Sequence, residues 1–554
     1  MAEGSKSWLR RLSGYAAPVL ITACLFAGAE ALLALSGVTP MIRHEDPYIG
    51  FASYLPLFAD GVDSDGNSVK VTAENKRKYF NTQSFRSTKP ANGYRIFTLG
   101  GSTTFGHPYD DATSFSGWLR AYLPEVDPSR HWEVVNCGGI SYASYRLARV
   151  MEELCQYEPD LFIVYTGHNE FLERRTFEGV LNTHPLERRI GTLVSRSRVY
   201  TVIQRWVTPF RSASSEVVLP AEVDTILDNS IGPSAYHRDD AYANLVREQF
   251  KHNLRRLVLL ARDADAPILF VTPPSNLRDC SPFKSESSDG LSEDAYAQFR
   301  RDLNRARMLI DEGRLPDALI ALDDCLAIDD GYAEAHFLRG RIFWELGEYE
   351  NAHRSFERAR DDDVCPLRAT GPLLAAIDEV VSKEAAGAID FDSMIGTLSE
   401  HGIPGNDWFL DHVHPTIEGN RQLSLSIVEH FIRTGIAAPA ATWNGETIDR
   451  VKTRVESEID TVEHGRALLT VAHVYLWGGK FDEARTAAYR ALAMSPDDWM
   501  PYYVLASLSQ LTGNLEEAIE WQRQAIELNP EYDLLQRQLD ELVAMREMAA
   551  GGGT

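Results

Sequence analysis

The stretch that decides the fold reads Tyr94-Arg95-Ile96-Phe97-Thr98-Leu99-Gly100-Gly101-Ser102-Thr103-Thr104-Phe105-Gly106. Its first half is apolar, as expected for a short buried strand, and its second half is a glycine turn that presents Ser102. A helix-compatible segment follows at 114–123. Ligands of open parallel sheets bind outside the carboxyl ends of the strands, where such turns lie. The stretch therefore predicts a strand-turn-helix unit with Ser102 at the functional edge of a sheet.

The turn after this strand is compatible with several kinds of site. A phosphate-binding loop needs Lys and then Ser or Thr after its second glycine, but His107 and Pro108 stand there, which excludes it. A nucleophile elbow has a glycine two residues on either side of the serine; Gly100 fits and Thr104 does not. A serine nucleophile of another esterase type and an ordinary structural turn remain open at this point.

The composition indicates a folded, acidic protein of several domains. With 554 residues the chain can hold about three domains, and its 44% apolar and 10% aromatic content supports a packed core. The net charge of −25 makes nucleic acid and an anionic membrane surface poor partners. The six cysteines include no Cys-x-x-Cys pair, which excludes a cysteine zinc site and a dense disulfide scaffold but leaves an isolated disulfide open.

The N-terminus has the pattern of a membrane anchor. Basic residues precede an apolar run at 15–29, which resumes after Glu30 and is about long enough to span a bilayer. A basic flank keeps the N-terminus in the cytoplasm and sends the rest of the chain outside. Cleavage after 27–29 and lipidation at Cys24 are the alternatives. We expect a single anchoring helix within 1–40 and a catalytic domain outside the cytoplasm, periplasmic or extracellular.

Apolar runs and amphipathic segments alternate along much of the chain. We expect strands at 94–99, 132–136, 160–165, 267–272 and 388–391, and helices at 114–123, 145–157, 199–206, 241–262, 373–384 and 417–433. Such alternation predicts an α/β fold with a parallel sheet and right-handed crossovers.

Two other segments repeat with a period of 34 residues. The recurring positions are Gly313, Ala318 and Leu322 with Gly347, Ala352 and Phe356, and Gly479, Ala484 and Pro496 with Gly513, Ala518 and Pro530. This period, with small residues where paired helices touch, is typical of tetratricopeptide repeats. Because about three repeats are normally needed for stability, we expect the two short blocks to pack together into one array beside the site.

The segment Asp411-His412-Val413-His414 is the second candidate site. An acid and a histidine three residues apart let one loop deliver an imidazole together with the carboxylate that orients it. A serine hydroxyl needs such a base to become a good nucleophile, and the carboxylate holds the imidazole in the useful tautomer. A metal site at Asp411, His412 and His414 and a purely structural role for the two histidines are the alternatives.

Four motif blocks in order give the chain a resemblance to the SGNH hydrolases, the GDSL-type esterase and lipase superfamily. The resemblance covers about 94–275 and about 366–435, with repeats between these parts. It implies a flavodoxin-like three-layer α/β/α fold with a parallel sheet. It also implies serine-dependent cleavage of ester bonds that requires no metal and no organic cofactor.

The resemblance implies a catalytic triad. Ser102 matches the nucleophile block, in which Gly101 stands where the family usually has Asp. Asp411 and His414 match the final Asp-x-x-His block. His414 would then take the proton of Ser102, and Asp411 would hold the histidine.

The resemblance also implies an oxyanion hole. Asn169, in the third block, matches the side-chain donor, and the N–H of Ser102 is one backbone donor. The other backbone donor belongs to the second block, where the family's glycine falls near Ser141, so that Gly138, Gly139 and Ser141 are all candidates.

The domain organisation that we expect has six parts. They are a cytoplasmic tail and membrane anchor at 1–40, an extended lead-in at 41–93, the first part of the hydrolase domain at 94–291, inserted repeats at 292–365, the second part of the hydrolase domain at 366–440 and C-terminal repeats at 441–554.

The expected function is that of a serine esterase acting on O-acyl groups of an exported or cell-envelope substrate, such as a polysaccharide. An O-acyltransferase with the same triad and a membrane-anchored repeat scaffold with a degenerate hydrolase core are the alternatives. The repeats predict a protein partner, because repeat surfaces bind partners.

Overall fold

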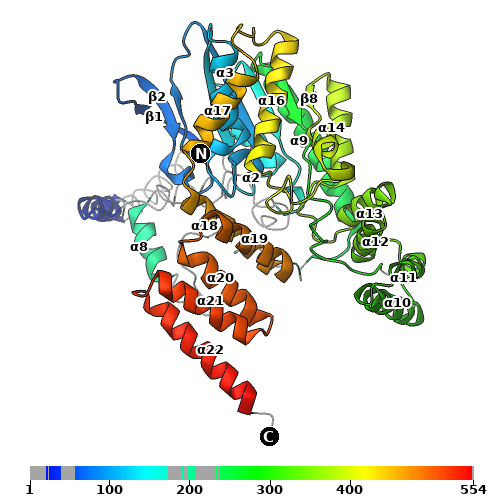
Figure 1. Ribbon diagram of the computed structural model, residues 1–554. Coiled ribbons are helices and arrows are strands. Elements are labelled where there is room, and N and C mark those ends of the chain that lie inside the picture. The colour runs from blue at the N-terminus through cyan, green and yellow to red at the C-terminus, as the bar shows by residue number, and fades with distance from the viewer. Residues whose placement is uncertain are drawn as a thin grey trace, which may run out of the picture. The chain divides into compact units, whose positions relative to one another are not determined.

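A five-stranded parallel sheet is the centre of the α/β part of the chain in the computed structural model (Figure 1). The structure describes residues 20–22, 24–38, 56–172, 197–207, 236–288 and 290–551, with the single residues 190, 194 and 233. The strands are β4 (Gly93–Gly100), β5 (His131–Gly138), β6 (Leu161–Tyr165), β7 (Ile268–Val271) and β8 (Gly387–Ile389). Their order is β5-β4-β6-β7-β8 with all pairs parallel, which is the flavodoxin-like order. The predicted parallel α/β fold is confirmed.

The register of the sheet aligns the ends of three neighbouring strands, β5, β4 and β6. Gly100, the last residue of β4, pairs with Gly138 of β5 on one side and with Tyr165 of β6 on the other. All five residues of β6 are buried, as expected for a parallel strand that is covered on both faces. The loops that follow these strands therefore start at the same level, at one edge of the sheet.

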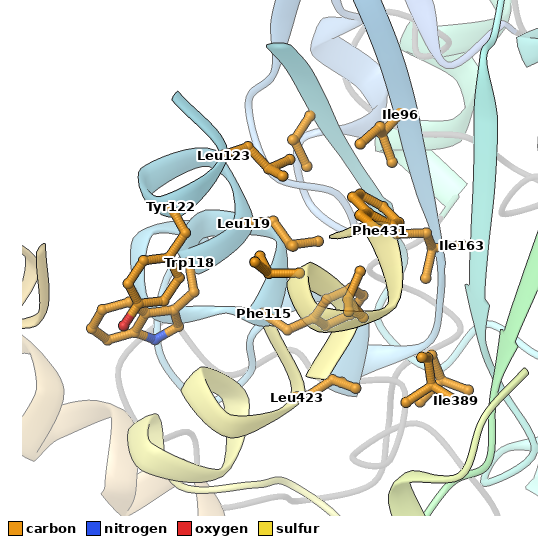
Figure 2. Close-up of a cluster of buried hydrophobic side chains, with 14 of the residues drawn as sticks. Ile96, Phe115, Trp118, Leu119, Tyr122, Leu123, Ile163, Ile389, Leu423 and Phe431 are labelled. Atoms are coloured by element: carbon orange, nitrogen blue, oxygen red, sulfur yellow. The ribbon is translucent and has the colours of Figure 1, made fainter. Parts of the chain in front are cut away.

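One face of the sheet is covered by four helices, α3 (Phe115–Val126), α15 (Phe391–Leu398), α16 (Ile417–Thr434) and α17 (Gly445–Ser457). Their apolar side chains meet those of the strands in one buried cluster (Figure 2), which includes Ile96, Ile163 and Ile389 of the sheet, Phe115, Trp118, Leu119 and Tyr122 of α3, and Leu423 and Phe431 of α16. The α3 residues follow the spacing of a single helical stripe. The hydroxyl of Thr416 accepts a hydrogen bond from the N–H of Gly419 at 3.1 Å and caps α16.

The other face is covered by α4 (Ser144–Leu154), α9 (Asp240–Asp263) and α14 (Gly371–Glu384), which pack beside one another. Successive side chains of a strand point to opposite faces, so Phe97 and Phe162, which stack with their centroids 6.1 Å apart, lie on this side. These helices and α3 and α16 were all predicted, whereas the sequence pattern missed α15 and α17. The predicted strand end at Phe391 is instead the first residue of α15.

The predicted lead-in at 41–93 contains a second, small sheet. Its strands are β1 (Phe58–Val62), β2 (Ser68–Thr72) and β3 (Ser84–Arg86), in this order, with β2 and β3 antiparallel and a 3-10 turn, η2 (Glu74–Lys76), between them. These strands are short and rich in polar residues, which is why the sequence pattern did not reveal them. Residues 41–55 lie outside the described residues.

The predicted N-terminal membrane helix is not supported. No helix in the described part of the chain is both long enough and apolar enough to cross a membrane. Of the predicted anchor at 1–40, residues 1–19, 23, 39 and 40 lie outside the described residues. The predicted export of the catalytic domain, and the cleavage and lipidation alternatives, stay predictions.

The smaller of two compact units comprises Met1–Ala59, Thr72–Lys78 and Gly179–Pro220. It includes α8 (Arg198–Val207). The carboxylate of Glu30 accepts hydrogen bonds of 3.1 Å from the N–H groups of Arg198 and Val199. A carboxylate at a helix N-terminus is favourable because the helix dipole is positive there. All other residues form the larger unit, which contains the parallel sheet and the repeats.

Both repeat blocks are built from consecutive helices that pack in pairs. The inserted block consists of α10 (Glu293–Asp311), α11 (Leu315–Ile328), α12 (Ala333–Glu345) and α13 (Tyr349–Asp361); the C-terminal block consists of α18 (Thr461–Trp477), α19 (Phe481–Met494), α20 (Trp499–Leu511), α21 (Leu515–Leu528) and α22 (Asp533–Gly551). The recurring alanines at 318, 352, 484 and 518 are fully buried between helices. The repeat architecture predicted from these positions is confirmed.

The two blocks do not form the single array that the sequence predicts. Among the described residues, no helix of the inserted block packs along a helix of the C-terminal block. Residues of α12, of α19 and of the segment 278–285 instead line a cavity of about 590 Å³ between the blocks.

Each block completes its core on the α/β domain. In the inserted block, Phe337 and Phe356 pack with Ile403, and Tyr349 stacks at 3.5 Å on His401 of the 3-10 turn η6 (Glu400–Gly402). In the C-terminal block, α18 and α19 share a buried cluster with Tyr109 and residues of the loops near the site. The α/β domain thus supplies the apolar surface that a third repeat would otherwise provide.

Candidate active site

Ser102 is the first residue of the short helix α2 (Ser102–Phe105), directly after β4, and is partly exposed. The two glycines before it have no room for a side chain. A Cβ atom on Gly100 would lie 2.0 Å from Oγ1 of Thr104, and one on Gly101 would lie 2.5 Å from Nδ2 of Asn169. The absence of a side chain at 101 therefore leaves the space that the Asn169 amide occupies beside the serine.

Ser102, His414 and Asp411 form one continuous chain of contacts. Nε2 of His414 lies 2.7 Å from Oγ of Ser102, and Nδ1 of His414 lies 2.6 Å from Oδ2 of Asp411. Because a carboxylate only accepts hydrogen bonds, Nδ1 carries the imidazole proton, and Nε2 is left as the acceptor for the serine hydroxyl. This arrangement can take a proton from Ser102 and hold the resulting charge next to Asp411.

The loop that carries Asp411 and His414 is closed by its own hydrogen bonds. The N–H of Leu410 donates to the carbonyl of His414, and the N–H of Thr416 donates to that of Trp408, both at 2.9 Å. Oδ1 of Asp411 accepts the N–H groups of Val413 and His414 at 2.8 Å, which fixes its carboxylate. The loop is therefore a preorganised unit that ends at the cap of α16.

Asn276 ties this loop to the segment after β7. Its N–H donates to the carbonyl of His412 at 3.0 Å, and its side chain donates to the carbonyl of Asp411 at 3.1 Å. Asn276 is fully buried. No spacing or motif in the sequence pointed to it, because its contact with the loop spans 135 positions.

The Asp411 carboxylate is held in its charged form. Burial alone would raise the pKa of Asp411, but the nearby His414 and His412 and the hydrogen bonds from His414 lower that pKa well below its usual value. At neutral pH, Asp411 is therefore an anion that can stabilise a positive charge on His414.

Two further histidines lie beside Ser102, His414 and Asp411 in their neutral forms. Burial, together with the nearby His414, lowers the pKa of His107 to about 3, and the ring of His107 meets that of His414 edge-on at 4.9 Å. Burial lowers the pKa of His412 to about 4, against the opposing effect of Asp411. Neutral rings at both positions avoid repulsion with a protonated His414. In the sequence, His107 served only to exclude a phosphate-binding loop, and nothing there predicted its contact with His414.

The candidate oxyanion donors can be separated by the hydrogen bonds that they already make. The N–H of Gly138 donates to Oδ1 of Asn136 at 2.9 Å, and the N–H of Gly139 donates to the carbonyl of Gly100 at 3.0 Å. The N–H of Ser141 has no hydrogen-bond partner among the described residues. Of the three candidates, Ser141 is thus the one whose N–H can bind a ligand.

Ser141 adopts a conformation that usually belongs to glycine. Its φ is 58°, in the left-handed region, which glycine adopts far more readily than serine. Arg146 donates to the carbonyl of Ser141 and places its guanidinium 3.8 Å over the ring of Tyr142. These contacts hold the peptide of Ser141 in place.

The Asn169 amide lies on the other side of this loop. Its Nδ2 donates to the carbonyl of Tyr142 at 3.1 Å. The next residue, Glu170, accepts the N–H of Ser144 at 3.0 Å and its hydroxyl at 2.7 Å. Asn169 and Glu170 are therefore joined by hydrogen bonds to the segment that directly follows Ser141.

The metal alternative at Asp411, His412 and His414 receives no support from the arrangement. Within the ranges that the structure describes, no group of three or more His, Cys, Asp or Glu side chains is placed to hold a metal ion. Asp411 and His414 bind each other, and the Nδ1 atom of His412 lies 3.6 Å from Oδ1 of Asp411.

Comparison with known proteins identifies the repeats. The tetratricopeptide repeat model matches residues 303–364 and 470–533, one segment in each helical block. No protein of curated function matches the chain in sequence.

Several solved structures are similar to the chain at low identity. The acetylxylan esterase Axe2 of Geobacillus stearothermophilus is 11% identical, with 62% of this chain and 95% of that chain covered and a TM-score of 0.27. A GDSL-like lipase of Bacteroides thetaiotaomicron is 10% identical, with 61% and 88% covered and a TM-score of 0.26. YrrB, a tetratricopeptide-repeat protein, is 17% identical, with 43% and 89% covered and a TM-score of 0.13. All three TM-scores are low.

Proposed function

We propose that this protein is a serine esterase in which Ser102 is the nucleophile, His414 the general base and Asp411 the carboxylate that orients the base. The observation that carries the proposal is the chain of contacts of 2.7 and 2.6 Å that leads from Ser102 through His414 to Asp411. A serine hydroxyl is a weak nucleophile until such a base removes its proton. The proposed substrates are O-acyl esters.

In the first half-reaction, Oγ of Ser102 attacks the ester carbonyl carbon while its proton moves to Nε2 of His414. The buried Asp411 carboxylate stabilises the imidazolium that forms. The imidazolium then gives this proton to the leaving alcohol oxygen as the ester C–O bond breaks. The acyl group is left on Ser102.

In the second half-reaction, water takes the place of the alcohol. His414 removes a proton from the water, which attacks the acyl carbon, and then returns that proton to Oγ of Ser102 as the acyl group leaves. The product is the free acid, and the triad returns to its starting state.

The negative oxygen of each tetrahedral intermediate needs hydrogen-bond donors. We propose the N–H groups of Ser102 and Ser141 and the side-chain amide of Asn169. Support comes from the N–H of Ser141, which has no partner within the part of the chain that the structure describes, and from the closeness of the Asn169 amide to Gly101. Gly138 is left out because its N–H is bound to Asn136. Each such donor is worth about 2.7–4 kcal/mol in the transition state.

A fluorophosphonate probe tests the proposal, because it reacts with activated serines. We expect one probe per chain, attached to the peptide that contains Ser102, and no labelling of Ser102→Ala or of heat-denatured protein. Folded wild-type protein that is not labelled, or is labelled at another serine, would contradict the proposal.

A further inference from the structure

The C-terminal repeats contact the loop that carries Asp411 and His414. Arg490, on α19, donates from Nη1 to the carbonyls of Phe409 and Leu410 at 3.0 and 3.1 Å. Its Nη2 donates to the carbonyl of Asn406 at 2.8 Å. A single guanidinium thus binds three carbonyl groups in the five residues before Asp411.

The contact is specific to the shape of arginine. A guanidinium presents five N–H donors in a rigid plane, whereas the ammonium of a lysine is a point charge with three donors. Phe409 is fully buried and Leu410 nearly so, which means that their carbonyls have little access to water. Leaving such carbonyls without a donor is unfavourable, so removal of Arg490 would allow the loop to rearrange.

The helix that presents Arg490 is itself fixed on the α/β domain. Lys480, just before α19, donates to the carbonyls of Ser281 and Pro282 at 2.9 Å, and Glu483 accepts the hydroxyl of Ser281 at 2.7 Å. Ten residues separate Lys480 from Arg490, about 15 Å along a helix. Two attachments at this distance fix both the rotation and the position of α19.

The same repeat block also touches the segment on the other side of the triad. His464, on α18, stacks on Tyr109 with ring centroids 4.2 Å apart and an angle of 13° between the rings. Tyr109 lies two residues after His107, whose ring contacts that of His414. The C-terminal repeats therefore contact both chain segments that adjoin His414.

We propose that Arg490 is a positioning residue of the active site: by holding the carbonyls of Asn406, Phe409 and Leu410, it keeps Asp411 and His414 in register with Ser102. This inference rests on the proposed esterase function. It gives the C-terminal repeats a part in turnover as well as in folding. A misplacement of about 1 Å in a reacting group can cost about 10²-fold in rate, so a loosened loop should lower kcat.

Arg485 provides a matched control on the same helix. Its guanidinium binds Glu517 at 3.0 Å and Thr512 at 3.1 Å, both within the repeats. Arg485→Ala therefore removes an arginine from α19 and weakens the repeat block without touching the catalytic loop. The comparison of Arg490→Ala with Arg485→Ala separates positioning from general stability.

The experiment measures kcat, KM and Tm of the full chain with a small aryl acetate. For Arg490→Ala we expect kcat to fall by about 10- to 10²-fold with KM changed less than about twofold. For Arg485→Ala we expect kcat within about twofold of the wild type, even if its Tm falls as much as that of Arg490→Ala. Arg490→Lys, which keeps the charge but cannot reach three carbonyls, should lose about tenfold in kcat and serves if Arg490→Ala does not fold.

The inference is overturned if the Arg490 variants keep wild-type kcat, or if Arg485→Ala loses as much kcat as Arg490→Ala. Ser102→Ala, assayed in parallel, separates a failure of the inference about Arg490 from a failure of the proposed esterase function. Full activity in Ser102→Ala would contradict the esterase itself and the inference with it. An inactive Ser102→Ala together with wild-type kcat in Arg490→Ala and Arg490→Lys would contradict the inference alone.

Discussion

Nε2 of His414 lies 2.7 Å from Oγ of Ser102, although 312 positions separate the two residues along the chain. The sheet accounts for the serine side of this contact, because β4 ends at Gly100 and its turn opens at the same level as the ends of β5 and β6. The loop before α16 accounts for the histidine side, because hydrogen bonds at Leu410 and Thr416 close it on itself.

Asp411→Asn should lower kcat by about 10³- to 10⁴-fold. The asparagine oxygen can still accept the N–H groups of Val413 and His414, so the loop keeps its shape. The amide nitrogen would replace the oxygen that now meets Nδ1 of His414, which favours the wrong imidazole tautomer. Steady-state kinetics and a thermal melt check this. A variant with nearly normal kcat would show that His414 does not depend on Asp411.

Asn169→Ala should lower kcat by about 10²- to 10³-fold, the usual value of one oxyanion donor, with little change in KM. Among the described residues, the Asn169 side chain makes one hydrogen bond, to the carbonyl of Tyr142, so Tm should fall only modestly. A rise in KM at constant kcat would mean instead that Asn169 binds the substrate in its ground state.

Gly101→Ala should also lower kcat, by about tenfold or more, although residue 101 carries no catalytic group. Its methyl group would come within 2.5 Å of Nδ2 of Asn169 and would displace the amide. Gly445→Ala is the control, because a Cβ atom there has no neighbour within 4 Å. Equal activities of the two variants would contradict the assigned place of the Asn169 amide.

Folding stability should fall as the pH is lowered from 7 to 5. Burial lowers the pKa of His412 to about 4, and the pKa of His168 is also lowered by burial, to well below its usual value. In the unfolded chain both histidines titrate near 6.5. Below that pH the unfolded state binds protons that the folded state does not, which disfavours folding by about 1.4 kcal/mol per histidine and pH unit.

His412→Gln tests this pH dependence. Between about pH 6.5 and 4 the variant has one fewer group that is protonated only on unfolding, so its Tm should fall less than that of the wild type. The charges around His412 are Asp411, which opposes the effect, and His414, Arg368 and Lys480, which add to it. An equal loss of Tm in both proteins would show that His412 does not carry the effect.

The sheet and its helices could be predicted because their sequence signals are local. The β6 strand is an unbroken apolar run, and the apolar residues of α3 repeat at helical spacing. The small sheet at 58–86 was missed because its strands are only three to five residues long. The packing of the repeats was predicted wrongly, because sequence shows which faces are apolar but not which partner covers them.

The residues of the candidate site also fall into those that the sequence could predict and those that it could not. Sequence motifs contain four of the candidate site residues and so could predict them: Ser102, Asn169, Asp411 and His414. Asn276 and Arg490 act through backbone carbonyls of distant segments, and such contacts leave no pattern in a single sequence. The N–H of Gly138 is bonded to Asn136 whereas that of Ser141 has no partner among the described residues, and a sequence does not show which N–H groups are bonded.

The most direct test of the central claim is the hydrolysis of a small aryl acetate by the wild type and by Ser102→Ala, with Tm measured on both. The exchange removes only a partly exposed hydroxyl, so the melting temperature should hardly change. The account predicts steady turnover by the wild type and no turnover above the uncatalysed background by Ser102→Ala. Wild-type turnover by the folded Ser102→Ala variant would contradict it.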